Sequence, residues 1–415
     1  MEEYLRKISE GHNDEYKTDK KNKESYAEVS TPYQLRKDML DKIPKKIWSN
    51  KNIKCLEPTS GKGGFLIDII LRFMHGLRRK IPNETKRYKH IVENMIYFAD
   101  INRKNVEVNI DLLDPDGKYR LHSYIGNTLQ MDIEKVWNVS QFDIVIGNPP
   151  YNDDSGAQGK GHTLWNLFVE KALQYWLKPN GLLVYVHPSG WRNVEGVCGE
   201  LLKSKRFLYL EIHNEKDGQK IFRCNTRYDW YVLKNQPNKG RKTKILGEDG
   251  KLYRVDMEGK PFIPNFKINQ ILKMVTKKEK DRFEILYSRS AYGANKDWVQ
   301  RKKTTKYKYP VIYSINRKNQ PTFFYSDTNK NGFFGIPKVI FASGATGFII
   351  DEKGRYGCTN FAKGMVVPKS QLNSLYKYLF TSSFKTLENA LSISFREINY
   401  KAMSLLKKNF WRMKI

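Results

Sequence analysis

The sequence predicts an α/β fold, in which a mostly parallel sheet is covered by helices, followed by a second region of different character. From residue 26 to about residue 234, short apolar runs typical of strands alternate with helical patterns. This alternation indicates a parallel sheet, because parallel strands are joined by crossover connections that are usually helices. Beyond residue 245 the alternation is lost, and the chain becomes basic, aromatic and rich in turn residues.

The expected elements can be given in chain order. The runs predicted as strands are 53–57, 96–100, 142–147, 181–187 and 228–233, and the helical patterns are 65–74, a segment from about residue 103, and 164–177. Residues 235–244 combine Pro, Gly, Asn and Lys with few apolar side chains, which predicts a linker. Residues 1–25 are predicted as a charged tail, either mobile or an exposed helix. Ligands bind at the carboxyl ends of the strands in such sheets, so chemistry is expected in the loops that follow the strands.

Basic residues are concentrated in the C-terminal part of the chain. The 415 residues hold 74 Lys+Arg and 44 Asp+Glu, a net charge of +30. Residues 241–415 hold 35 of the basic and 13 of the acidic residues, a net of +22, against 39 and 31 in the remainder, a net of +8. Cations and aromatic residues are interleaved at 298–309, and Asn-Arg-Lys-Asn follows at 316–319. The imbalance favours a polyanionic partner, with a phosphate backbone preferred to a solvated surface or an acidic membrane.

Several protein classes are disfavoured by the sequence. The charged N-terminal residues argue against a secretory signal, and no apolar run approaches the roughly 18–20 residues of a membrane span. The cysteines, Cys55, Cys198, Cys224 and Cys358, are far apart and lack nearby histidine partners. This spacing argues against a zinc site or a disulfide framework, so we expect no metal and a reducing, intracellular compartment.

The first informative loop is rich in glycine and follows the first predicted strand. It runs from Glu57 through Pro58, Thr59, Gly61 and Gly63 to Phe65. Its glycines would let a ligand approach the backbone next to the start of a helix. The loop lacks the Gly-Lys-Ser/Thr ending of a phosphate-binding loop and the full dinucleotide fingerprint. Taken alone, it is as well explained as a structural turn.

The second and third loops carry polar groups. Asp100 ends the second predicted strand, where a carboxylate can bind ribose hydroxyls or can simply cap the next helix. Asn148, Pro149, Pro150 and Tyr151 follow the third predicted strand directly. Two consecutive prolines stiffen the loop and fix the direction of the carbonyls and of the amide. An amide oxygen, a backbone carbonyl and an aromatic ring together form a receptor for a planar group that carries an NH₂.

With these loops, the sequence resembles the S-adenosylmethionine-dependent N6-adenine DNA methylases of restriction–modification systems. The resemblance covers about residues 26–234. Besides the three loops, it is carried by Thr31-Pro32-Tyr33 before the Gly loop, Gly126-Asn127, and the segments 178–183, 187–191 and 225–230, all in the expected order. Within this family, the sequence is similar to the subgroup that has N-terminal Thr-Pro and Gly-loop motifs and a C-terminal target recognition domain. Over 240–415 the resemblance is weak.

The resemblance implies a fold and a domain arrangement. The catalytic domain, 26–234, would be a Rossmann-like class I methyltransferase sheet, mostly parallel with its last strand antiparallel, and with helices on both faces. After the linker, residues 245–415 would form a basic, mixed α+β target recognition domain. The implied cofactor is S-adenosylmethionine, and the implied partner is double-stranded DNA. A cytoplasmic location and a separate cognate restriction endonuclease are also expected.

The resemblance also assigns site residues and shows two departures. The implied cofactor residues are Thr31, Pro32, Glu57, Pro58, Thr59, Gly61, Gly63, Phe65, Asp100, Ile101, Asn127 and Asn148, and the implied catalytic residues are Asn148, Pro149, Pro150 and Tyr151. The family usually has Asp where this chain has Glu57, and often Asn where it has Gly64. Thr31 fits a helix N-cap with Pro32 as the first helical residue, in a helix expected to run to Ile43.

The Asn148 loop suggests how an adenine amine could react. This amine is a poor nucleophile because its lone pair is delocalised into the ring. If the Asn148 side-chain oxygen and the Pro149 carbonyl accept its two hydrogens, the lone pair can turn toward an electrophilic methyl group. Tyr151 would stack on the base, which must first leave the duplex at a cost of a few kcal/mol.

Other functions stay open from the sequence. The same loop would serve an enzyme that methylates RNA adenine or a protein glutamine amide, and a non-catalytic DNA-binding subunit is a further alternative. The basic C-terminal region disfavours the protein substrate. The recognition sequence and the oligomeric state cannot be read from the chain.

Overall fold

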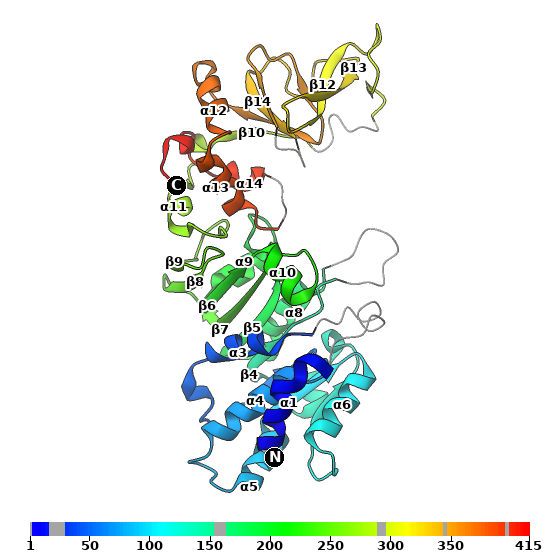
Figure 1. The fold of residues 1–415 in the computed structure, drawn as a ribbon, viewed down its shortest axis with the longest axis vertical. Helices are drawn as coiled ribbons and strands as arrows, with labels where there is room; N and C mark the ends of the chain where they lie inside the picture. The colour runs from blue at the N-terminus through cyan, green and yellow to red at the C-terminus, as the bar shows by residue number, and fades with distance from the viewer. Residues whose placement is uncertain (1, 16–29, 153–162, 289–295, 343–346, 395–397) are drawn as a thin grey trace. The chain divides into compact units, whose positions relative to one another are not determined.

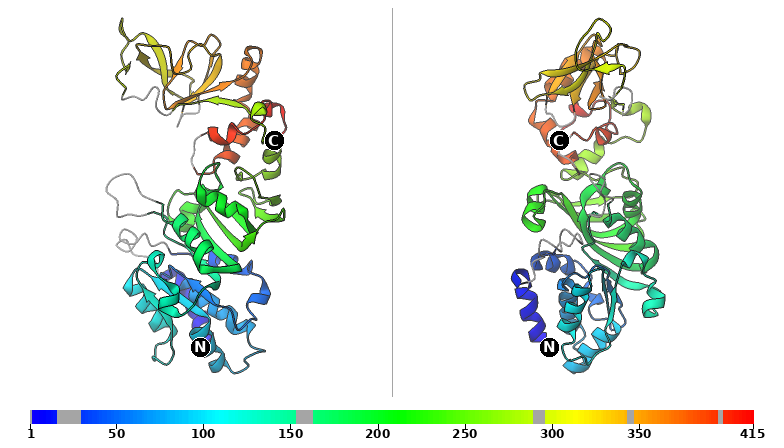
Figure 2. Two further views of the ribbon diagram at one scale, coloured as in Figure 1. Left: turned by 180° about the vertical axis from the view of Figure 1, so that it is seen from behind. Right: turned by 90° about the vertical axis from the view of Figure 1, so that its right-hand side faces the viewer.

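The computed structural model describes residues 2–15, 30–152, 163–288, 296–342, 347–394 and 398–415 (Figures 1 and 2). The chain forms two compact units. Unit 1 comprises Met1–Trp191 and Glu195–Lys260, and unit 2 comprises Arg192–Val194 and Pro261–Ile415. Each unit has its own buried core.

Unit 1 is built on a nine-stranded sheet with the strand order β3-β2-β1-β4-β5-β7-β6-β8-β9. The strands are β1 Cys55–Glu57, β2 Ile96–Asp100, β3 His122–Ile125, β4 Phe142–Gly147, β5 Leu177–Pro188, β6 Lys205–His213, β7 Tyr228–Pro237, β8 Lys242–Leu246 and β9 Leu252–Asp256. β3, β2, β1, β4 and β5 pair in parallel, whereas β7 runs antiparallel to both β5 and β6. The predicted fold class, with an antiparallel last strand, is therefore confirmed.

Helices cover both faces of this sheet because its central strands are apolar on both sides. The helices of unit 1 are α1 Glu2–Glu15, α3 Tyr33–Asp41, α4 Gly64–Gly76, α5 Glu84–Asn94, α6 Arg103–Leu113, α7 Ile133–Trp137, α8 Trp165–Lys171, α9 Val197–Ser204 and α10 Glu215–Phe222. Along β2, Ile96 and Phe98 face the core built with α1, α3, α4 and α5. Tyr97, between them, packs against Trp137 of α7 on the opposite face.

The sequence prediction missed part of the sheet and misplaced some bounds. β3 and β6 were not expected, because β3 is only half-buried and β6 begins with two basic residues. β5 begins at Leu177 rather than at residue 181, since the preceding helix ends in a short π-helical turn at Ala172–Trp176.

Residues 2–15 form helix α1 and not a tail. Leu5 is fully buried and Ile8 lies three residues further on, so the two share one helical face that packs on the core of unit 1. Glu2 is buried at the start of the helix, and its carboxylate lies 2.7 Å from the Arg78 guanidinium. The high proportion of charged residues concealed this short apolar stripe. Residues 16–25 of the predicted tail lie outside the described residues.

The predicted linker, residues 235–244, lies inside unit 1. β7 continues to Pro237, β8 starts at Lys242, and β8 pairs in parallel with β6. Between the two strands, Asn238 is buried and its amide donates to Asp256 Oδ1 at 2.7 Å. The polar, turn-rich composition therefore reflects a connection between strands of one sheet. The division between the units falls after Lys260.

Unit 2 contains two small sheets and four short α-helices among its described residues, in agreement with the expected mixed α+β character. One antiparallel sheet has the order β10-β17-β14-β15 and the other sheet has the order β11-β13-β12-β16. Their strands are β10 Glu284–Leu286, β11 Val299–Gln300, β12 Tyr309–Ile315, β13 Pro321–Ser326, β14 Lys338–Ala342, β15 Phe348–Asp351, β16 Gly357–Cys358 and β17 Ala362–Val366 (yellow to orange in Figures 1 and 2). The helices are α11 Ile268–Met274, α12 Leu372–Tyr378, α13 Ser382–Leu391 and α14 Tyr400–Met403.

A buried ion pair joins two strands of the first small sheet. Lys338 is fully buried, and its ammonium lies 2.9 Å from Asp351 Oδ2. The same ammonium also donates to the carbonyls of Phe333 and Ile336 at 2.9 and 3.1 Å. All three donor positions of the lysine are therefore used, as burial of a charge requires.

Among the described residues, no helix combines the length and the apolar character needed to cross a bilayer.

A buried histidine is expected to make unit 1 sensitive to acid. His187 in β5 stacks on Trp165 with ring centroids 4.3 Å apart, and its Nε2 lies 2.9 Å from the Tyr231 hydroxyl. Burial lowers the pKa of His187 to about 4 from an ordinary value of 6.5. The folded state thus keeps the ring neutral at pH values at which the unfolded chain takes up a proton.

We expect the stabilisation that depends on neutral His187 to be complete above about pH 6.5 and to be lost as the pH falls toward about 4. The loss should amount to about 1–3 kcal/mol. Thermal unfolding of the wild type and of H187Q at about pH 7.5 and about pH 5 measures it. The difference between the two pH values should be smaller for H187Q, and an equal difference would contradict the assignment.

Candidate active site at the carboxyl ends of the strands

The loop after β1 is bonded to the loops after its neighbouring strands. Ser60 N donates to the Ala99 carbonyl of β2 at 2.9 Å. The Thr128 hydroxyl, beyond β3, donates to the Pro58 carbonyl at 2.7 Å. The Thr59 hydroxyl lies 3.5 Å from the Asn148 carbonyl after β4. The three loops that the sequence singled out therefore meet at one edge of the sheet, as parallel strands require.

The Gly loop needs glycine at Gly63, which adopts φ +83° as the N-cap of α4. A Cβ at this position would lie 2.3 Å from Asn109 Oδ1. Asn109, on α6, is fully buried, and its amide donates to the Ser60 hydroxyl and to the Gly61 carbonyl, both at 3.0 Å. Asn109 thus supports the Gly loop through these two hydrogen bonds. Gly61, with φ +48°, faces open space, since a Cβ there would meet nothing within 4 Å.

Asp100 joins the loops after β1 and β2. Its Oδ2 accepts from Gly61 N and its Oδ1 accepts from Asn102 N, both at 2.8 Å. The N-cap of α6 is Asn102, whose side chain accepts from Lys104 N, so the capping alternative for Asp100 is wrong. The next residue, Ile101, is 56% exposed.

Glu57 is a buried carboxylate at the end of β1. It is 2% exposed, and burial raises its pKa well above the usual value, although the nearby Arg36 opposes this effect. Its Oε2 has no hydrogen-bond partner in the part of the chain that the structure describes. The end of β1 therefore carries a buried carboxylate with one oxygen that is not hydrogen-bonded by the described residues.

The Asn148 loop begins where β4 ends. Gly147 adopts φ +155° and lies beside Thr59 and Glu57, so the Asn148 loop starts next to the Gly loop. Pro149 is buried, while Asn148 and Pro150 are half-buried. The Tyr151 carbonyl accepts from Leu164 N at 3.0 Å, which joins the loop to the start of α8.

The ring of Tyr151 lies against Phe222 of α10. Their centroids are 6.0 Å apart and their planes are inclined by 78°. Burial raises the pKa of the Tyr151 hydroxyl well above the usual value. Phe222 is 3% exposed and belongs to the core of unit 1, so its role as a core aromatic residue is evident. Stacking of Tyr151 on a base stays a prediction.

The Thr-Pro segment differs from the expected helix start. Pro32, with ψ 150°, is the N-cap of α3, and the Thr31 side chain makes no cap. Helix α3 ends at Asp41 rather than at Ile43. The extended backbone at Pro32 places the first helical turn one residue later. The Thr31 carbonyl instead accepts from Arg36 Nη1 at 2.6 Å.

Two further predicted cofactor residues have structural roles. Phe65 is 3% exposed within the core, so its side chain faces away from solvent. Asn127 is exposed, and its side-chain oxygen accepts from Leu129 N to cap the short 3₁₀ helix Thr128–Gln130. Asn109 and Arg36 were not predicted, because a supporting contact from a distant helix leaves no signal in the local sequence.

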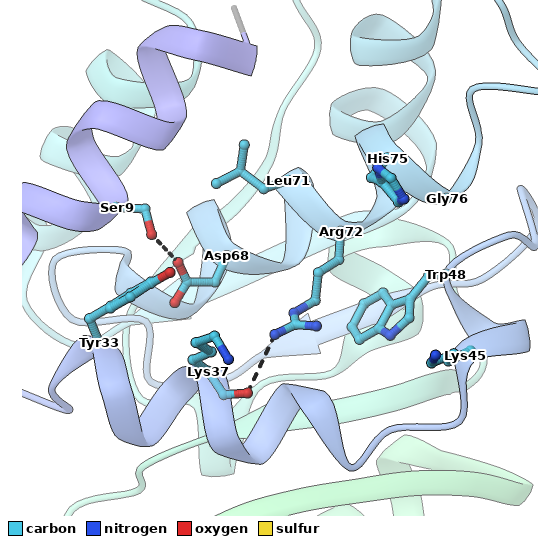
Figure 3. A pocket seen from close by; sticks show the side chains of 10 residues that line it. All are labelled: Ser9, Tyr33, Lys37, Lys45, Trp48, Asp68, Leu71, Arg72, His75 and Gly76. Atoms are coloured by element: carbon cyan, nitrogen blue, oxygen red, sulfur yellow. Dashed lines mark hydrogen bonds between the residues drawn. The ribbon is translucent and has the colours of Figure 1, made fainter.

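A pocket of about 580 Å³ lies elsewhere in unit 1, between α3 and α4 (Figure 3). Its lining includes Lys37 on α3 and Asp68 and Arg72 on α4. It contains none of the residues predicted for catalysis or cofactor binding. The pocket is therefore separate from the residues that the sequence predicted for catalysis and cofactor binding.

Comparison with known proteins identifies the central part of the chain. Residues 77–222 match the family described as Eco57I restriction-modification methylase. The segment includes Asp100, Asn127 and the Asn148 loop, whereas the Thr31 segment and the Gly loop precede it. The expected resemblance to the adenine methylases of restriction–modification systems is thus confirmed over this segment.

Two curated relatives agree with this family. An uncharacterized adenine-specific methylase of Mycoplasma pneumoniae is 25% identical, over 40% of this chain and 55% of that protein. The type II methyltransferase M.HincII of Haemophilus influenzae is 22% identical, over 48% of this chain and 35% of that protein. The chain therefore spans about half of the first relative's length and a third of the second's.

Solved structures of larger enzymes resemble the fold of both units. The type IIL restriction-modification enzyme MmeI, in complex with DNA, is 11% identical with a TM-score of 0.50, covering 94% of this chain and 69% of that one. A nuclease-deletion mutant of the type ISP enzyme LlaGI, bound to a DNA substrate mimic, is 11% identical with a TM-score of 0.51, covering 89% and 52%. At this identity the likeness concerns the fold alone.

Proposed function

We propose that the chain is an adenine-specific DNA methyltransferase of restriction–modification type, which methylates the exocyclic amine of an adenine flipped out of a specific duplex site. The observation that carries the proposal is the family match over the segment that contains the Asn148 loop. The contact between the Thr59 hydroxyl and the Asn148 carbonyl supports it, because it brings the expected substrate and cofactor loops together.

The proposed cofactor is S-adenosylmethionine, which supplies an electrophilic methyl group when bound. The unpartnered oxygen of buried Glu57, the open side of Gly61 and exposed Ile101 suit a ligand with a cationic amine at one end and an aromatic base at the other. The first N–H groups of α3, after Thr31 and Pro32, would face its carboxylate. By the resemblance, Asp100 at the end of β2 would bind the ribose hydroxyls and Asn127 would lie near the adenine.

The proposed mechanism needs no strong base. The Asn148 side-chain oxygen and the Pro149 carbonyl accept the two hydrogens of the adenine amine. They hold its lone pair out of the ring plane and stabilise the positive charge that develops on nitrogen. Pro150 stiffens the loop and Tyr151 supports the extruded base. Positioning and dipoles thus supply the rate enhancement.

Double-stranded DNA is the proposed partner of the basic unit 2. Trp298 is 36% exposed with the Lys296 ammonium 5.5 Å from its ring, and Lys306 and Lys308 lie 5.3 and 5.4 Å from the rings of Tyr307 and Tyr309. Such pairs present cations to phosphates and aromatic faces to bases. A cytoplasmic location and a separate cognate endonuclease complete the proposal.

DNA affinity is expected to fall steeply with salt. The slope of log affinity against log salt should be about −0.9 for each phosphate neutralised. Replacing the exposed Lys302 and Lys303 with glutamine should reduce the slope, measured by fluorescence anisotropy with a labelled duplex. Glutamine at Lys89 and Lys118 of unit 1 provides the control. A complex insensitive to salt would contradict the electrostatic role of unit 2.

The function can be tested on DNA from cells that express the protein. Sequencing that detects modified adenines should find N6-methyladenine at one recurring sequence, and this signal should be absent with an Asn148→Ala variant. Methylated RNA or glutamine, with unmodified DNA, would favour the alternative amino-methyltransferases. An unmodified proteome, RNA and DNA would favour a non-catalytic DNA-binding subunit.

A further inference from the structure

A buried guanidinium connects the segment before α3 to α4. Arg36 is 2% exposed, and its Nε lies 2.7 Å from Asp68 Oδ2. Its Nη1 donates to the Thr31 carbonyl at 2.6 Å. One side chain of α3 therefore bonds both to the residue that precedes the helix and to the second turn of α4. No assigned motif includes Arg36.

The space for this guanidinium is provided by Gly64. A Cβ built on Gly64 would lie 2.8 Å from Arg36 Nη1 and 2.9 Å from its Cζ. Gly64 is one of the two positions where the sequence departs from the family it resembles, since asparagine is often found there. The position of the Arg36 guanidinium therefore depends on glycine at residue 64, because any side chain there would displace the guanidinium.

The environment of Arg36 is acidic. The positive charge of Arg36 lowers the pKa values of both Glu57 and Asp68, against the effect of burial, which raises them. The Ser9 hydroxyl of α1 donates to Asp68 Oδ1, so α1 completes this network (Figure 3). Arg36 therefore holds the Thr31 carbonyl through a side chain that is itself fixed by Asp68, and it lies close to the carboxylate at the end of β1.

We propose that Arg36 is a positioning residue for the cofactor: it fixes the Thr31-Pro32 segment relative to the Gly loop, and the absence of a side chain at Gly64 admits its guanidinium. This inference rests on the proposed function. Because Arg36 acts through the Thr31 backbone and not on the reacting amine, its loss should weaken cofactor binding and change the chemical step little.

Arg72 offers a matched control on the same helix. It also joins α4 to α3, with its guanidinium 2.7 Å from Asp41 Oδ1. The same guanidinium lies 3.4 Å from the Lys37 carbonyl (Figure 3). Its side chain is 25% exposed, and it lies one helical turn beyond Asp68, away from Thr31 and the Gly loop. If Arg36 only held α3 against α4, changes at Arg72 would have the same consequences.

The first test compares R36K with R72K. Lysine keeps the charge but loses the planar fork that reaches two acceptors in fixed directions. Cofactor binding is measured by calorimetry, and KM and kcat are measured by steady-state kinetics on duplex DNA. For R36K, the KM for S-adenosylmethionine should rise about tenfold, while kcat should change less than about threefold. R72K should change the KM for S-adenosylmethionine and kcat by less than about twofold each. Equal effects of the two variants, or a fall in kcat alone for R36K, would overturn the proposal.

A double variant separates packing from positioning. G64A alone should lower the unfolding temperature, because its methyl group meets the guanidinium. R36K/G64A removes the Nη1 atom that the methyl group would meet but keeps a cation beside Asp68, so it should recover part of the stability without recovering cofactor affinity. Recovery of both would show that Arg36 only fills space and would overturn the proposal. Absence of cofactor binding by the folded wild-type protein would instead refute the proposed function.

Discussion

Asn148→Ala is expected to lower the rate of methyl transfer to DNA by about a hundredfold to a thousandfold. The side-chain oxygen of Asn148 would accept a hydrogen of the adenine amine, and no other described side chain of its loop offers an equivalent acceptor. The backbone of residue 148, which Thr59 contacts, is kept in the variant. Affinities for S-adenosylmethionine and for duplex DNA should therefore change little, so that the loss appears in kcat.

The control variants for this prediction lie in and next to the same loop. N148D retains an acceptor oxygen and should therefore keep part of the activity. N152A removes an exposed amide four residues on and should be close to wild type. Single-turnover rates with saturating DNA separate chemistry from binding. A normal rate for N148A would mean that the loop is structural, and the proposed mechanism would then be wrong.

Gly63→Ala is expected to cause the largest loss of stability among changes at the site. The methyl group would meet Asn109 Oδ1 at 2.3 Å, and the backbone at residue 63 would stay at φ +83°. Together the clash and the left-handed backbone should lower the free energy of unfolding by about 3 kcal/mol or more, measured by urea denaturation. Cofactor affinity should fall as well, since Asn109 supports the loop.

Gly61→Ala separates the cost of the left-handed backbone from the cost of the clash with Asn109. Gly61 also has a positive φ, +48°, but its Cβ would point into open space. Only the backbone cost remains, and it should be about 1–2 kcal/mol. The double variant G63A/N109A should recover part of the loss caused by G63A. If G61A and G63A were equally destabilising, the packing of Asn109 against Gly63 would have no energetic role.

The predictions made from the sequence were most accurate where the pattern is local. The apolar runs that became β1, β2, β4, β5 and β7 are short and strongly buried, so periodicity and turn residues identified them. β8 and β9 alternate exposed and buried residues within a basic region, and their charged faces concealed them. Helix α1 was missed for a similar reason, since its buried face is narrow.

The site could be predicted only as far as the loops themselves. Strand ends, glycines and prolines indicated Glu57, Asp100 and the Asn148 loop, and the structure brings these loops together through Thr59, Gly61 and Thr128. The supporting residues Arg36 and Asn109 belong to helices, and their importance depends on tertiary contacts that no spacing in the sequence reveals. Thr31 shows the opposite case, because a good capping pattern was overridden by the extended backbone at Pro32.

The central claim can be tested most directly with purified protein, methyl-labelled S-adenosylmethionine, and duplex DNA, RNA and protein offered in one reaction. Digestion of the DNA to nucleosides should recover the label as N6-methyl-2′-deoxyadenosine, and the N148A variant should not form this product. Label recovered only in RNA or in protein, or DNA methylation that persists in N148A, would contradict the account.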